Sequence, residues 1–92
     1  MDPQDFYLKL RTTLDETTTF PSKYLYKFII PNSKAKIEQI HDIFNHLGAV
    51  IETKPSKNGN YISISVLVLM ENVNQVIEKY REAGKIEGII SL

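Results

Sequence analysis

The chain contains no cysteine. This absence excludes disulfide bonds, thiolate nucleophiles and cysteine-based zinc sites. An excess of charge of either sign is also missing, because eleven basic residues balance eleven acidic ones. General electrostatic attraction to nucleic acid or to an anionic membrane is therefore not expected, and any such binding would need a local patch.

Long hydrophobic runs are missing as well. No stretch approaches the length of a membrane-spanning helix, and the first residues lack the apolar run and cleavage site of a signal peptide. We therefore expect a soluble, cytoplasmic protein with no membrane partner. What is present, 92 residues of which 42% are hydrophobic and 24% charged, is typical of one globular domain.

Residues 1–19 are predicted to form an amphipathic helix and a connector. Asp2 is a suitable N-cap for a helix that starts with proline at its first position. The apolar residues that follow recur every fourth position on one stripe, which predicts a helix over residues 3–14. They are Phe6, Leu10 and Leu14.

Residues 20–92 are predicted to form the domain itself, which begins with a strand and a helix. Segment 23–30 is rich in residues that favour strands and has proline only at its margins. Its alternate residues Tyr24, Tyr26, Phe28 and Ile30 share one face. Next comes a helix capped by Asn32 or Ser33, with an apolar stripe that stops at Gly48.

A β-hairpin over residues 49–70 follows. Asn58-Gly59 is a strong signal for a two-residue type I′ turn, which needs positive φ at both central positions. This turn would place Ser56 opposite Tyr61 and, further along, Val50 opposite Leu67. The register is self-consistent, because it gathers the apolar side chains on one face of the hairpin.

The last third of the chain is predicted to supply a second helix and a closing strand. Asn72, with Gln75 three residues later, resembles a capping box, and Gly84 is placed to end the helix. The alternating segment 86–92 closes the sheet. The order β-α-β-β-α-β with right-handed crossovers predicts a ferredoxin-like α+β fold. It has a four-stranded antiparallel sheet of strand order 4-1-3-2 with both helices on one face.

One face of this sheet is left open. Strand parity assigns to it Leu25, Lys27, Ile29, Val50, Glu52, Lys54, Tyr61, Ser63, Ser65, Leu67, Leu69 and Ile89. One end of the face is apolar, and the N-terminal helix enters the first strand at that end. We therefore expect the stripe of the N-terminal helix to cover it.

Several segments of residues 20–92 resemble the YbeD-like family of small uncharacterised proteins. The resemblance lies in Phe20-Pro21, in Tyr26-Lys27, in the run from Lys54 to Tyr61 with Ser63 and Ser65 after it, and in Gly84-Lys85-Ile86. It implies a ferredoxin-like domain similar to ACT regulatory domains, which bind small metabolites, commonly amino acids, and often dimerise. Amino-acid-binding ACT domains usually have glycine between the first strand and the first helix. Pro31-Asn32-Ser33 stands there in this chain, which argues against amino-acid sensing.

A polar cluster around the hairpin turn is the main candidate binding site. It consists of Lys27, Lys54, Ser56, Lys57, Asn60, Tyr61, Ser63 and Ser65. Cations and hydroxyls of this kind hold phosphate or carboxylate groups through charge-assisted hydrogen bonds. The alternative is that folding alone explains the pattern, since lysine and proline protect an edge strand and serines form cross-strand pairs. We favour the second interpretation.

Two further binding functions have weaker signals. An exposed Tyr61 after a loop with lysine and glycine is similar to the RNA-recognition motif, but the aromatics of the first strand fall on the core face. His41, His46, Asp42 and Glu38 share a helix surface that helical i, i+4 partners explain. We therefore predict no metal and no other cofactor.

Catalysis is not expected. The sequence contains neither a nucleophile elbow nor a phosphate-cradling glycine loop. Glu52 and Glu87 would stand on opposite edges of the sheet, too far apart to act as an acid-base pair. We predict a non-enzymatic regulatory or protein-interaction domain. Its partner is a protein or a second copy, bound through the open face or through the edge of the closing strand Ile86 to Leu92. The alternatives are a sensor of a small anionic metabolite and an RNA-binding module.

Overall fold

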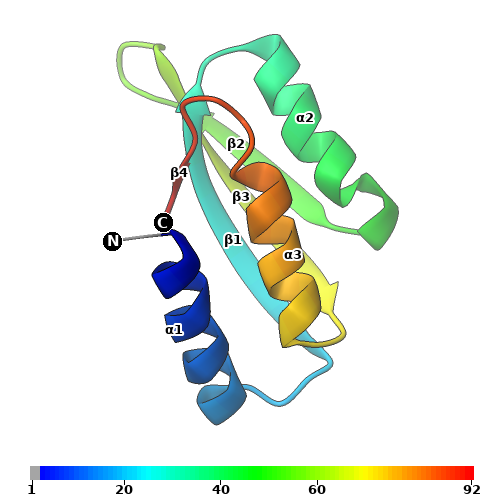
Figure 1. Cartoon of the computed structure of the whole chain (residues 1–92). Helices are drawn as coiled ribbons and strands as arrows, with labels where there is room; N and C mark the ends of the chain where they lie inside the picture. The colour runs from blue at the N-terminus through cyan, green and yellow to red at the C-terminus, as the bar shows by residue number, and fades with distance from the viewer. Residues whose placement is uncertain (1–2) are drawn as a thin grey trace.

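The computed structural model describes residues 3–92, without the side chain of Pro3, as three α-helices, one short 3-10 helix and four strands (Figure 1). Their bounds are α1 Pro3–Thr17, β1 Ser22–Pro31, α2 Lys34–Phe44, η1 Asn45–Leu47, β2 Val50–Pro55, β3 Tyr61–Met70, α3 Val73–Ala83 and β4 Ile90–Ser91. All strand pairs are antiparallel. The predicted α+β class and four-stranded antiparallel sheet are confirmed.

The strands lie in the order β2-β3-β1-β4, which is the order 4-1-3-2 read from the opposite edge of the sheet. β3 therefore has a neighbour on each side, and Leu67 lies opposite both Val50 of β2 and Leu25 of β1. Figure 1 shows α2 and α3 on the same side of the sheet. No helix of residues 3–92 covers the other side.

The hairpin has the predicted register but not the predicted turn. Val50 pairs with Leu67, and the Ser56 N–H donates to the Tyr61 carbonyl at 2.8 Å. A type I′ turn is wrong, because Gly59 has a φ of 77° whereas no non-glycine residue of the described chain has positive φ. The Asn58 side chain instead accepts hydrogen bonds from the Ser56 hydroxyl and the Asn60 N–H. The longer loop retains the register because it adds one residue on each side.

Helices α2 and α3 begin where the sequence indicates, although α2 ends at Phe44 and η1 continues the chain to Leu47. The Ser33 hydroxyl caps α2 by accepting from the Lys36 N–H. At α3 the Asn72 side chain accepts from the Gln75 N–H at 2.8 Å, and the Gln75 side chain accepts from the Glu71 N–H at 2.7 Å. The bonds to Ser33 and Asn72 satisfy backbone donors that the first turn of a helix leaves without a partner, and the bond from Glu71 fixes the residue before the cap.

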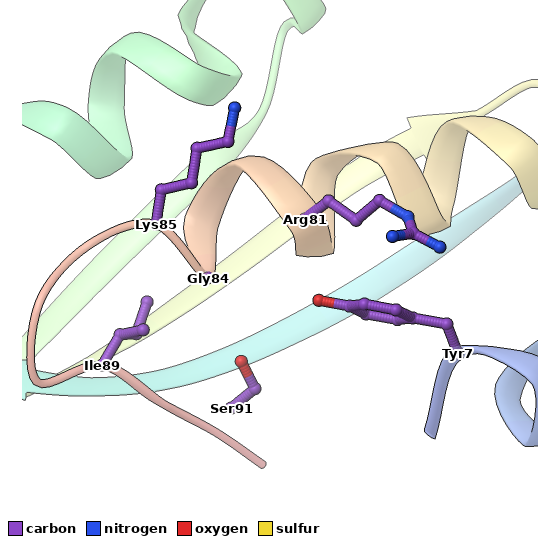
Figure 2. A pocket seen from close by; sticks show the side chains of 6 residues that line it. All are labelled: Tyr7, Arg81, Gly84, Lys85, Ile89 and Ser91. Carbon is purple, nitrogen blue, oxygen red and sulfur yellow. The ribbon is translucent and has the colours of Figure 1, made fainter. Parts of the chain in front are cut away.

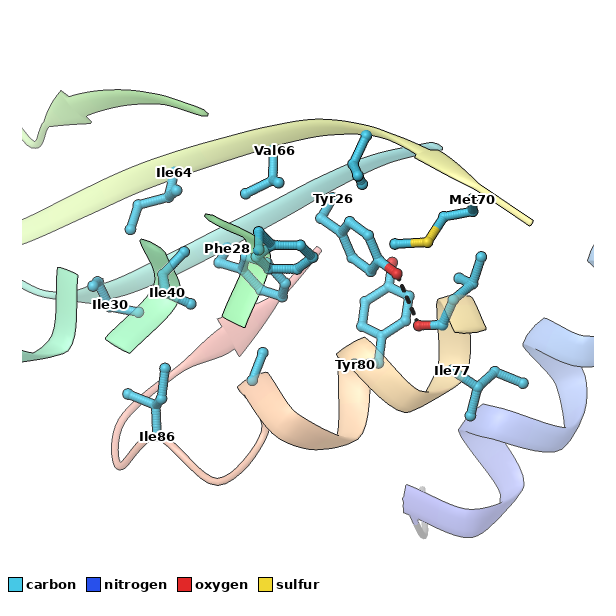
Figure 3. Packing of buried hydrophobic residues seen from close by; sticks show 14 of the residues in the cluster. Tyr26, Phe28, Ile30, Ile40, Ile64, Val66, Met70, Ile77, Tyr80 and Ile86 are labelled. Carbon is cyan, nitrogen blue, oxygen red and sulfur yellow. Dashed lines mark hydrogen bonds between the residues drawn. The ribbon is translucent and has the colours of Figure 1, made fainter. Parts of the chain in front are cut away.

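The core lies between the sheet and the helices (Figure 3). Tyr26, Phe28 and Ile30 project into it from β1, as predicted, and Tyr26 is completely buried. The Tyr26 hydroxyl donates to the Val76 carbonyl of α3 at 2.8 Å. The hydroxyls of Tyr24 and Tyr80 share a hydrogen bond of the same length. An aromatic group therefore joins β1 to α3.

The predicted position of α1 is wrong. The helix packs against α3 rather than over the open face, since the Phe6 ring lies 5.9 Å from that of Tyr80 and Leu14 belongs to the core cluster. It also extends to Thr17, beyond the predicted end at residue 14. The proposed N-cap, Asp2, lies outside the described residues. An amphipathic stripe indicates that one face of a helix is buried, but not which surface covers it.

The closing strand is much shorter than predicted. β4 contains Ile90 and Ser91 alone, and the Leu92 N–H adds one hydrogen bond to the Lys27 carbonyl at 2.9 Å. Ile86 is buried just after α3, and Gly88 turns the chain with a φ of 83°. The segment 86–92 therefore does not offer the long pairing edge that the sequence suggested for a dimer.

Candidate functional site

The open face of the sheet presents an apolar group at one end. Its members are Leu25, Val50, Leu67 and Leu69, and each is between 39% and 59% exposed. Leu25, Val50 and Leu67 form one row across β1, β2 and β3. With Glu52 and Ser65 they line a shallow hollow. An exposed aliphatic cluster of this kind is typical of an interaction surface.

The next row of the open face carries opposite charges. Ser65 of β3 lies opposite Glu52 of β2 and also opposite Lys27 of β1. The two charged side chains thus stand on either side of the middle strand, two strand spacings or about 10 Å apart. Neither takes part in an ion pair with another described residue.

The predicted polar cluster is divided between two places. Lys27, Lys54, Ser63 and Ser65 lie on the open face, where Lys54 is opposite Ser63 and Lys27 is opposite Ser65. Ser56, Lys57 and Asn60 belong to the loop of the hairpin. Tyr61, 48% exposed, stands between the two groups and lines a hollow with Ser56, Lys57 and Asn58.

The polar groups of the loop bond to one another and to the end of β1. The Ser56 hydroxyl donates to the Asn58 side chain at 2.9 Å and accepts from the Tyr61 N–H at 3.0 Å. Asn32 holds the loop from the other side, since its side-chain amide donates to the Gly59 carbonyl at 2.8 Å. Folding therefore occupies the groups at the turn, while Lys54 and Lys57 remain exposed.

One residue was assigned to the wrong face. Ile90, rather than Ile89, lies on the open face, because it pairs directly with Ile29 and is 52% exposed. Ile89 packs against the core cluster. The parity error follows from the turn at Gly88, which shortens the strand.

His41 of α2 and His46 of η1 do not form a metal site with the carboxylates near them in the described chain. His41, His46, Asp42 and Glu38 are all exposed. Within residues 3–92 no three histidine, aspartate or glutamate side chains are grouped closely enough to hold a metal ion. No helix in the same range is long and apolar enough to cross a membrane.

The buried tyrosines are structural rather than acid-base groups. Burial raises the pKa of Tyr26 well above its ordinary value. Burial also raises the pKa of Tyr80, and the hydrogen bond with Tyr24 adds to this effect. Both hydroxyls therefore stay protonated at neutral pH and serve as hydrogen-bonding groups.

Sequence reasoning missed the surface where α1 meets α3. Tyr7, Arg11 and Arg81 lie there, and the Arg81 guanidinium stands over the Tyr7 ring at 4.5 Å from its centre. Figure 2 shows this pair beside the end of α3. The sequence contains two arginines in all, one in α1 and one in α3. With α1 expected on the open face, these two residues were expected on opposite sides of the sheet.

Comparison with known proteins identifies relatives along most of the chain. The model of a family described as "Protein of unknown function (DUF493)" matches residues 15–92. A UPF0250 protein of Erwinia tasmaniensis and the UPF0250 protein YbeD of Escherichia coli are each 30% identical over 81 residues. In both cases the match covers 85% of this chain and 93% of the relative.

Solved structures resemble the fold at lower sequence identity. The solution structure of protein HP0495 from H. pylori superposes with a TM-score of 0.65 at 19% identity, over 83% of this chain and 86% of that one. The uncharacterised protein TM1266 from Thermotoga maritima gives 0.60 at 13% identity, over 77% and 94%. These likenesses show the fold alone.

Proposed function

We propose that this chain, which belongs to the DUF493 family of proteins of unknown function, is a non-enzymatic interaction domain whose open sheet face binds the same face of a second copy. One observation carries the proposal. The residues on the two sides of β3 suit a two-fold axis parallel to that strand. One row has an apolar residue on each side of β3, and the next row has a positive charge on one side and a negative charge on the other.

The symmetry argument depends on which residues such an axis would superimpose. A two-fold axis that runs parallel to β3, between the two sheets, places β2 of one copy over β1 of the other, because these strands are the neighbours of β3. Val50 would then meet Leu25 of the second copy, and Glu52 would meet Lys27. Each contact occurs twice, which is the property of a two-fold interface.

The exposed apolar row supports the same arrangement. Two sheets that pack face to face interdigitate their side chains at a spacing of about 10 Å. This contact would remove four aliphatic side chains of each copy from water, and the charged row would lie beside them. Charge complementarity then fixes the orientation, because like charges placed opposite each other are strongly unfavourable.

The proposal predicts the outcome of a charge exchange. Glu52→Lys would place lysine opposite Lys27 of the second copy, and Lys27→Glu would place two glutamates together. We expect each single variant to weaken dimerisation at least about tenfold. The double variant, which restores opposite charges, should recover most of the affinity. Sedimentation equilibrium over a concentration series gives the dimer dissociation constant of the wild type, the two single variants and the double variant.

Glu38→Lys is the matched control, because it makes the same change on an exposed position of α2. It should leave the dimer affinity unchanged. A wild-type protein that remains monomeric at millimolar concentration would refute the proposal. So would equal affinities for the single and double variants.

The hairpin cluster is the basis for the other functions considered from the sequence. A metabolite sensor or RNA-binding module would use Lys54, Lys57 and Tyr61, which are exposed. The internal hydrogen bonds of Ser56 and Asn58 favour a folding role for the turn itself. Among the described aromatic residues Tyr61 alone lies on the open face, whereas RNA-recognition motifs stack several bases.

A further inference from the structure

The groove between α1 and α3 brings together the two arginines of the chain. Arg11 comes from α1 and Arg81 from α3, seventy positions later in the sequence. Both line a cavity of about 230 Å³, together with Gln4, Tyr7, Leu8 and Ile77. Guanidinium groups present several N–H donors in a planar fork, which suits phosphate and carboxylate groups.

Neither guanidinium forms an ion pair with another residue of the range that the structure describes. Across residues 3–92 the single ion pair within 4 Å joins Lys79 to Glu82, both on α3. Arg81 makes a cation–π contact with the Tyr7 ring, which engages the face of the guanidinium and leaves its edge donors available. The Tyr7 ring therefore holds one cation in place at the rim of the cavity.

A second hollow of about 550 Å³ continues from the first past the end of α3. It shares Tyr7 and Arg81 with the cavity and adds Gly84, Lys85 and Ser91. In Figure 2 the Tyr7 hydroxyl points into this hollow, whereas Lys85 points away from Tyr7. Gly84 lies beside the Tyr7 hydroxyl, since a Cβ at this position would be 3.6 Å from it, in ordinary van der Waals contact.

We propose that this groove binds a small organic anion, whose phosphate or carboxylate group lies between Arg11 and Arg81. The Tyr7 hydroxyl supplies a further hydrogen bond from the second hollow. The site lies on the helical side of the sheet and does not depend on the proposed dimer. Its α1 half, up to Arg11, precedes residues 15–92 that the family model matches. Arg81, in contrast, lies within the matched residues.

NMR titration of the full chain tests the site. Because the chain has two arginines, its two side-chain Nε–H resonances report on the site directly. Inorganic phosphate and acetate are added in separate titrations at constant ionic strength. We expect saturable shifts of both arginine resonances and of the Tyr7 amide. Stronger saturation by phosphate would identify a phosphoryl ligand, and stronger saturation by acetate a carboxylate.

Two substitutions at Arg11 separate anion binding from a structural role. Arg11→Gln should weaken binding at least about tenfold, whereas Arg11→Lys, which retains the charge but not the planar fork, should weaken it clearly less. Lys57→Gln removes a cation from the distant hairpin loop and should have no effect. Shifts that do not saturate, or that survive in Arg11→Gln, would overturn the proposal. Equal losses in Arg11→Gln and Arg11→Lys would also overturn it.

Discussion

At the scale of single residues, the buried tyrosines couple stability to pH. Tyr26 is completely buried and Tyr80 is 5% exposed, and burial raises the pKa of both hydroxyls in the folded protein. In the unfolded chain each hydroxyl ionises near pH 10. The raised pKa values therefore favour folding fully below that pH, and the benefit is lost as the pH rises above it.

This coupling predicts alkaline unfolding. Above pH 10 the free energy of unfolding should fall by up to about 1.4 kcal/mol per pH unit for each buried tyrosine, hence about 2.7 kcal/mol per unit for both. Tyr26→Phe should reduce this slope to about half. At neutral pH the same change should destabilise the fold by about 1 kcal/mol, because the hydrogen bond to the Val76 carbonyl is lost. Urea denaturation between pH 8 and pH 11 provides these values.

Tyr61→Phe is the control for the alkaline measurement. Tyr61 is 48% exposed on the open face, so its removal should leave both the slope and the neutral stability nearly unchanged. A Tyr26→Phe protein with the full wild-type slope would contradict the assignment of the pH dependence to Tyr26.

At the scale of elements, local signals predicted more than long-range ones. Ser33, Asn72 and Gln75 act through the backbone within four residues, and their caps are confirmed. The register of the hairpin was predicted from the alternation of apolar and polar residues, so it is correct although the predicted turn type is wrong. Alternation also continues in residues 86–92, but Gly88 turns against Pro31, which lies far away in the sequence. That contact could not be foreseen from the local pattern.

The position of α1 provides a test of how this element is held. Leu14 is 7% exposed and belongs to the core cluster, whereas Leu8 of the same helix is 52% exposed. Leu14→Ala should lower the free energy of unfolding by about 2–4 kcal/mol, because it leaves a cavity. Leu8→Ala makes the same chemical change and should cost less than about 0.5 kcal/mol. Thermal or urea denaturation compares the two.

A helix over the open face would reverse part of this expectation. In that arrangement Leu14 would cover the open face instead of packing in the core, so Leu14→Ala would change the solubility of the protein rather than its stability. Equal and small effects of both substitutions would show that α1 is not packed on α3 in solution.

At the scale of the whole molecule, the sheet separates two surfaces of different chemistry. The open face carries the apolar row with Glu52 and Lys27, and α2 and α3 lie on the opposite side (Figure 1). The groove with Arg11 and Arg81 is on that helical side, between α1 and α3. The two surfaces share no residue. The packed core lies between them, and the hydrogen bond from Tyr26 to the Val76 carbonyl joins β1 to α3.

The two surfaces should therefore act independently. Two ligands influence each other only when binding of the first changes the affinity of the protein for the second. Such coupling is reciprocal. Phosphate affinity measured at protein concentrations below and above the dimer midpoint should agree within about twofold. Glu52→Lys should leave phosphate affinity unchanged, and Arg11→Gln should leave the dimer constant unchanged. A matching change in both cross-measurements would instead show that the core transmits a conformational difference from the groove to the open face.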